Sequence, residues 1–86
     1  MFSTAKLERH QRLSTEMAEK LGIDLEEVAM RGEVPPEELQ NVVLRCTACS
    51  EAQACRDWLG DHPNGGALPP AYCRNKDLFK ALMPED

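Results

Sequence analysis

Long apolar runs are missing from this chain of 86 residues, and aromatic side chains are few. No segment approaches the roughly 18 apolar residues of a membrane-spanning helix, and the first residues lack the apolar stretch of a signal peptide. We therefore expect a cytoplasmic protein with no membrane partner. Two Phe, one Trp and one Tyr supply little bulk, so the core must consist mainly of Leu, Val, Met and Ala.

Basic charge is scarce as well. Ten Lys and Arg residues stand against fifteen Asp and Glu residues, which gives a formal net charge of −5. Binding to nucleic acid or to an anionic membrane surface requires a basic patch, so we expect neither. An acidic surface is instead of the kind that small electron carriers use to dock on a protein redox partner.

Motifs of enzyme active sites are also missing. The sequence contains no phosphate-binding G-x-x-x-x-G-K-S/T loop, no H-E-x-x-H and no G-x-S-x-G. Neighbouring carboxylates occur at Glu26-Glu27 and Glu37-Glu38, in the first turns of predicted helices, where they complement the helix dipole. The sequence therefore argues against an enzyme and against a small-molecule substrate.

Cysteine, by contrast, is well represented. A C-x2-C-x5-C run is followed seventeen residues later by a fourth cysteine, and the set is Cys46, Cys49, Cys55 and Cys73. Because cytoplasmic thiols stay reduced, these residues indicate metal ligands before they indicate disulfides or free thiols. Zinc sites usually bring two short-spaced pairs, whereas this chain has one. We predict a 4Fe–4S cluster on the four thiolates, with zinc as the alternative.

The hydrophobic pattern predicts an all-α protein, a single domain of about five short helices pinned by the four-cysteine metal centre. The predicted helices cover approximately residues 4–21, 25–31, 35–46, 51–59 and 76–83. The first carries Leu13, Met17 and Leu21 at four-residue intervals, a stripe that should pack on the metal-binding half. Residues 1–34 form the amino-terminal helices without a ligand, and residues 35–86 form the cysteine-ligand region.

Several helix ends are marked by capping residues. Asp24 is expected to cap the second helix, with Glu27 returning a hydrogen bond to it. Ser50 and Gln53 suggest a second capping box before the fourth helix, and Asn75 should cap the last. The stretch from residue 60 to residue 70 is rich in glycine and proline and is predicted to be a loop.

Residues beside the cysteines are candidate parts of the site. Trp58, one helical turn after Cys55, and Tyr72, next to Cys73, could shield a metal centre or serve as ordinary packing. Arginines adjoin three of the cysteines, namely Arg45, Arg56 and Arg74. They could stabilise a negatively charged cluster and raise its reduction potential, or they could simply be solvated.

Two segments carry a resemblance to known families. R-C-x2-C-x5-C-x2-W-L at residues 45–59 and P-x-Y-C-R-N at residues 70–75 resemble a family of small uncharacterised alphaproteobacterial proteins. The C-x2-C-x5-C run by itself is similar to that of 4Fe–4S proteins such as the WhiB-like regulators and the iron-staple nucleases of the RecB type. In those proteins the fourth cysteine precedes the run, whereas here it follows, so the resemblance implies a ligand pattern only.

These observations predict a small iron–sulfur protein that transfers electrons or serves as a redox partner. Two alternatives stay open: a zinc-stabilised protein-interaction module, and an iron–sulfur redox sensor or regulator. Shielding aromatics favour the carrier, because a carrier must keep its cluster through each cycle. The glycine-rich stretch from Gly60 to Gly66 favours the sensor, because a mobile connection beside Cys73 could open the cluster.

Overall fold

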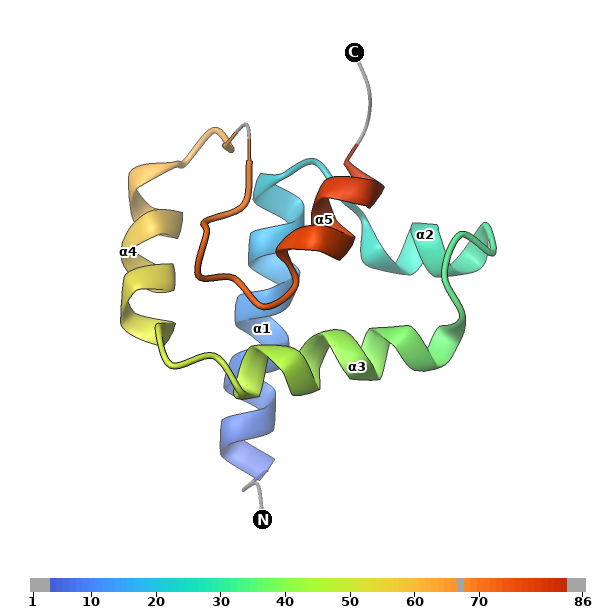
Figure 1. The fold of residues 1–86 in the computed structure, drawn as a ribbon, viewed down its shortest axis with the longest axis horizontal. Coiled ribbons are helices and arrows are strands. Elements are labelled where there is room, and N and C mark those ends of the chain that lie inside the picture. Colours follow the sequence, from blue (N-terminus) through green and yellow to red (C-terminus); the bar gives the residue numbers. More distant parts are fainter. Residues whose placement is uncertain (1–3, 67, 84–86) are drawn as a thin grey trace.

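Five α-helices make up the regular structure of the chain (Figure 1). A computed structural model describes residues 4–66 and 68–83, and every regular element in those ranges is helical, as the sequence predicts. The helices are α1 (Thr4–Lys20), α2 (Leu25–Met30), α3 (Pro36–Thr47), α4 (Ala52–Asp61) and α5 (Lys76–Leu82).

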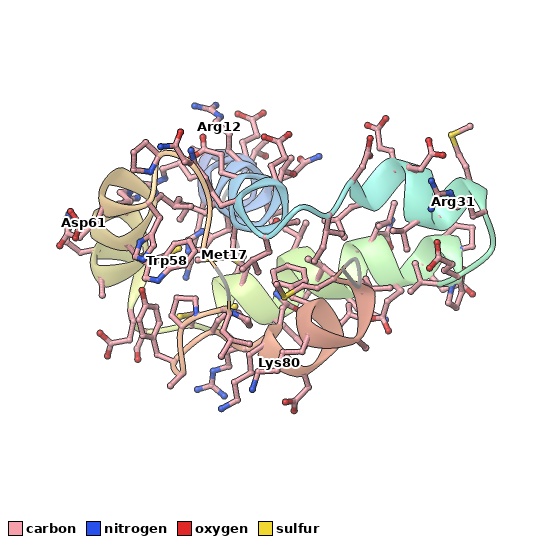
Figure 2. The ribbon with its side chains drawn as sticks, turned by 90° about the horizontal axis from the view of Figure 1, so that it is seen from above. Arg12, Met17, Arg31, Trp58, Asp61 and Lys80 are labelled. Atoms are coloured by element: carbon pink, nitrogen blue, oxygen red, sulfur yellow. The ribbon has the colours of Figure 1, made fainter. Side chains whose placement is uncertain are left out.

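The longest helix, α1, occupies the middle of the molecule. It packs against α3 and α4, and α2 packs against α3. In both views α2 and α4 lie at opposite ends, with α1 between them (Figures 1 and 2). The radius of gyration is 12.3 Å, close to the value of about 12 Å expected for one compact domain of this length.

The core forms where α1 meets the other helices. Met17 is 2% exposed and Phe79 of α5 is fully buried, and both belong to one apolar cluster. The predicted stripe on α1 is confirmed, because Leu13 and Leu21 are buried in the same cluster. Figure 2 shows Met17 in the middle of the molecule. It shows the charged side chains at the outside, namely Arg12, Arg31, Asp61 and Lys80.

The end of α1 depends on a glycine. Gly22 has a φ of 81°, a left-handed conformation that other residues rarely adopt. This turn lets the Ile23 N–H donate to the Ala18 carbonyl at 2.8 Å, and the Gly22 N–H donate to the Glu19 carbonyl at 3.0 Å. The pair of bonds is a Schellman cap, and it satisfies carbonyls that the helix leaves open.

The predicted capping box at the start of α2 is half correct. The Asp24 carboxylate accepts the Glu27 N–H at 3.1 Å, which confirms Asp24 as the cap. The Glu27 carboxylate, however, does not return the bond to Asp24; it accepts from Arg31 at 3.1 Å, one turn further along α2. The ion pair is exposed, so we expect it to add little stability.

The predicted capping box before α4 is wrong. The residue in the cap position is Glu51, with no side-chain capping bond, and the Ser50 hydroxyl lies 3.5 Å from the Glu51 carboxylate. Instead the Glu51 N–H donates to the sulfur of Cys49 at 3.4 Å. The helix also continues through Gly60 to Asp61, two residues beyond the predicted end, so the loop begins only at His62.

The connection after α4 is held against α1. The Gly66 N–H donates to the Lys20 carbonyl at 3.1 Å, and the Lys20 ammonium donates to the Pro63 carbonyl at 2.9 Å. A Cβ atom on Gly66 would lie only 2.6 Å from the Trp58 ring, so glycine permits the close approach. Gly66 therefore lets this segment pack against Trp58, and hydrogen bonds at Pro63 and Gly66 hold the segment on Lys20 at the end of α1.

Buried apolar side chains on α1 should carry much of the stability. We predict that Met17→Ala lowers the free energy of unfolding by about 2–5 kcal/mol, because it leaves a cavity in the core. Met30→Ala is the matched control, since Met30 is 83% exposed, and its effect should stay within about 0.5 kcal/mol. Chemical denaturation followed by circular dichroism measures both. Equal small effects would show that α1 is not part of the core.

Candidate metal centre

All four cysteines face one cavity of about 30 Å³. They are free and half-buried. One side of the cavity is formed by α1, which contributes His10, Leu13, Ser14 and Met17. Phe79 of α5 closes it toward the core. The structure therefore brings together the four residues that the sequence predicts as ligands, although Cys73 is far from the others along the chain.

The C-x2-C pair is presented by the end of α3. Cys46 lies in the last turn of the helix, which ends at Thr47. The chain then turns, and the Cys49 N–H donates to the Cys46 carbonyl at 3.1 Å. This turn places both thiols on the same cavity, which is the geometric use of a two-residue spacing between ligands.

The other two cysteines come from different segments. Cys55 lies in the first turn of α4, where its N–H donates to the Glu51 carbonyl at 2.9 Å. Cys73 follows the Pro-Pro turn, and its N–H donates to the Pro70 carbonyl at 3.0 Å. Each cysteine is thus held by a local backbone hydrogen bond.

Backbone N–H groups already point at two of the sulfurs. The Glu51 N–H donates to Cys49 Sγ at 3.4 Å, and the Asn75 backbone N–H donates to Cys73 Sγ. Donors of this kind stabilise thiolates and tune metal–sulfur centres, because they spread the negative charge of the sulfur. The Cys49 thiol itself faces the Tyr72 carbonyl at 3.9 Å.

Without a cation, the cavity disfavours thiolates. Burial, followed by the repulsion of the other cysteines, raises the pKa of Cys46 from 9.0 to about 12. Burial and the neighbouring Cys73 and Cys49 raise the pKa of Cys55 to about 11, against the opposing charge of Arg56. Burial likewise raises the pKa of Cys73. Several thiolates can coexist here only if a positive group lies between them.

The four cysteines line the cavity without forming a preformed metal site. Among the described residues, no three His, Cys, Asp or Glu side chains are arranged to hold a metal ion as they lie. The pinning of the fold by a metal centre therefore stays a prediction.

The three arginines beside the cysteines lie in different environments. Both Arg56 and Arg74 are exposed; Arg74 also lines the cavity, and the charge of Arg56 acts on Cys55. Arg45 donates from Nη2 to the Glu38 carboxylate at 2.9 Å and from Nε to the side-chain oxygen of Asn75 at 2.7 Å. Arg45 therefore joins segments of the fold.

Asn75 has a larger role than the predicted helix cap. It occupies the cap position of α5, but its side chain makes no capping bond. It is 2% exposed, and its amide donates to the Val42 carbonyl at 2.9 Å while its oxygen accepts from Arg45. Asn75 thus ties the Cys73 segment to α3, one turn before Cys46.

The two aromatic candidates separate in the structure. Trp58 packs on the core and stacks on His62, with ring centroids 4.1 Å apart, but it does not line the cavity. Tyr72 does line the cavity. Its hydroxyl oxygen is buried and, among the described residues, is the one buried side-chain N or O atom with no hydrogen-bond partner.

One comparison identifies the family. A family model for DUF6455, described as a family of unknown function, matches residues 1–85. The chain belongs to DUF6455. Neither a curated protein nor a solved structure matches the chain. Within the described residues, no helix is long and apolar enough to cross a membrane.

His10 lines the cavity of this DUF6455 protein, although it is not among the site residues that the sequence predicts. It is 8% exposed, and its Nδ1 donates to the Lys6 carbonyl at 2.9 Å. His10 precedes Leu13 by three positions and Met17 by seven, so it shares their face of α1. That spacing is the signal that places it on the cavity wall.

The raised thiol pKa values predict how the metal-free DUF6455 protein responds to alkali. The folded state keeps thiol protons that the unfolded chain releases, so stability is fully present below pH 9.0 and falls as pH rises toward 11 or 12. We predict that Cys46→Ala weakens this fall. The free energy of unfolding of wild type and variant is measured by denaturation at several pH values. Both proteins contain the same lysines, so the contribution of lysine titration cancels in the difference. Parallel pH profiles would contradict the prediction.

Proposed function

We propose that this DUF6455 protein is a small cytoplasmic redox protein that holds a 4Fe–4S cluster and exchanges electrons with a protein partner. The proposed ligands are Cys46, Cys49, Cys55 and Cys73. One observation carries the proposal: four free cysteines from separate segments line a single cavity. A cluster bound there supplies reversible one-electron chemistry. With four protein ligands no coordination position is left for a substrate, so we propose no catalytic step.

Features of the cavity support a bound metal centre. Three of its thiols have raised pKa values, so a compensating cation would be required to hold them together as thiolates. Backbone N–H groups donate to Cys49 and Cys73, as expected around metal-bound sulfur. The buried Tyr72 hydroxyl lacks a partner that a bound group could supply.

The ligand spacing supports a cluster over a single zinc ion. Zinc sites usually bring two short-spaced cysteine pairs, whereas this chain has one, Cys46 and Cys49. Cys55 and Cys73 follow singly. The C-x2-C-x5-C run is similar to that of 4Fe–4S proteins.

The anchored connection after α4 supports a carrier over a sensor. A sensor must expose its cluster and change fold when the cluster breaks. In this chain the Gly66 N–H and the Lys20 ammonium hold the connection to α1, and His62 stacks on Trp58. These contacts oppose the opening that the glycine content alone suggests. The net charge of −5 supplies an acidic surface for docking on a partner.

Purification without oxygen tests the proposal. We predict a brown protein with broad visible absorption, containing about four iron and four sulfide ions per chain. Each of the four Cys→Ser variants should lose most of this iron and unfold at lower temperature, because metal binding and folding are coupled. Ser14→Ala is the matched control: Ser14 lines the cavity but is no ligand, so its loading should be normal.

Two outcomes would overturn the proposal. A colourless protein with one zinc ion per chain would replace the redox function with a structural metal in an interaction module. Full iron content in Cys73→Ser would exclude ligation by all four thiolates.

Repeated reduction and reoxidation tests the carrier role. We predict that the wild type keeps its iron and helix content through several cycles. Gly66→Ala should lose iron faster, because the new Cβ meets the Trp58 ring and detaches the connection from α1. Gly60→Ala is the control, since nothing lies within 4 Å of its Cβ. Iron loss with unfolding in the wild type on mild oxidation would favour the sensor.

A further inference from the structure

The Tyr72 hydroxyl is an anomaly in this structure. Buried polar atoms nearly always have a hydrogen-bond partner, because water is not there to replace one. Tyr72 lines the four-cysteine cavity, and its hydroxyl oxygen is buried without a partner among the described residues. A phenylalanine would fill the same space without this penalty, so the hydroxyl calls for a partner that binds in the cavity.

The surroundings of Tyr72 indicate what that partner is. Its backbone carbonyl faces the Cys49 thiol at 3.9 Å, and Cys73 is the next residue. A tyrosine hydroxyl carries its proton at neutral pH and can donate a hydrogen bond. The four cysteines line the same cavity as Tyr72, so the acceptors that a metal centre bound there would offer are sulfurs.

We propose that the Tyr72 hydroxyl donates a hydrogen bond to a sulfur atom of the bound metal centre and thereby acts as a positioning residue for the cluster. The inference rests on the proposed function. A donor at this place stabilises negative charge on sulfur, and the charge is greater in the reduced cluster. Tyr72 thus raises the reduction potential as well as the retention of the cluster.

This role predicts that Tyr72→Phe changes the unfolding temperature in opposite directions in the metal-free protein and in the cluster-loaded protein. In the metal-free state Tyr72→Phe removes an unpaired buried hydroxyl, so the unfolding temperature should stay the same or rise. In the loaded state the same change removes a hydrogen bond to a charged acceptor. The unfolding temperature should then fall, and a chelator should remove iron about tenfold faster. Simple aromatic packing gives no such reversal.

Thr47→Val is the matched control. The Thr47 hydroxyl is also near a ligand, but it is satisfied, donating to the Leu44 carbonyl at 2.7 Å, and it does not line the cavity. Its removal should lower the unfolding temperature in both states and leave the reduction potential unchanged. Tyr72→Phe should shift the potential to more negative values.

The experiment compares wild type, Tyr72→Phe and Thr47→Val, each metal-free and each reconstituted anoxically with ferrous iron and sulfide. The reversal in unfolding temperature together with the negative potential shift supports the inference. The inference alone is overturned if the wild type takes up the cluster but Tyr72→Phe changes the unfolding temperature in the same direction in both states and leaves the reduction potential unchanged. If wild type takes up no iron and sulfide, the proposed function and the inference are overturned together.

Discussion

The constraint on which this structure depends is the desolvation of four thiols around one small cavity. Burial and mutual repulsion raise the pKa of Cys46 to about 12 and that of Cys55 to about 11, and burial raises the pKa of Cys73. Neutral thiols satisfy the site without a ligand, but they leave the N–H groups of Glu51 and Asn75 donating to weak sulfur acceptors. A cation in the cavity would favour thiolates over neutral thiols. The attraction between the cation and each thiolate is stronger in a buried site than in water.

The cavity and the hydrophobic core are one unit. Leu13, Met17 and Phe79 belong to the apolar cluster and also line the cavity, so the same side chains hold α1 and α5 and exclude water from the thiols. A domain of 86 residues buries limited apolar surface, so its free energy of unfolding is small. A group bound between the cysteines would cross-link α3, α4 and the segment before α5, and folding and binding would then be linked.

Features that depend on neighbouring residues could be predicted from the sequence, and features that depend on distant partners could not. Asp24 acts within one turn of its own helix, and it caps α2 as the sequence predicts. Ser50 fails as a cap because α4 begins one residue later, with Glu51 in the cap position, and the start of α4 depends on the turn after α3. Asn75 finds its partners 30 and 33 residues away, beyond the reach of any local pattern.

The placement of Arg45 changes how the charge of a centre would be balanced. Engaged by Glu38 and Asn75, its guanidinium is committed to joining α3 to the Cys73 segment. Arg56 acts from an exposed position, where water screens its charge. The groups already directed at sulfur are backbone N–H donors, and Tyr72, whose buried hydroxyl has no partner among the described residues, lines the same cavity. Dipoles of this kind stabilise negative charge without adding net charge, so the chain keeps the net charge of −5 on which the proposed docking depends.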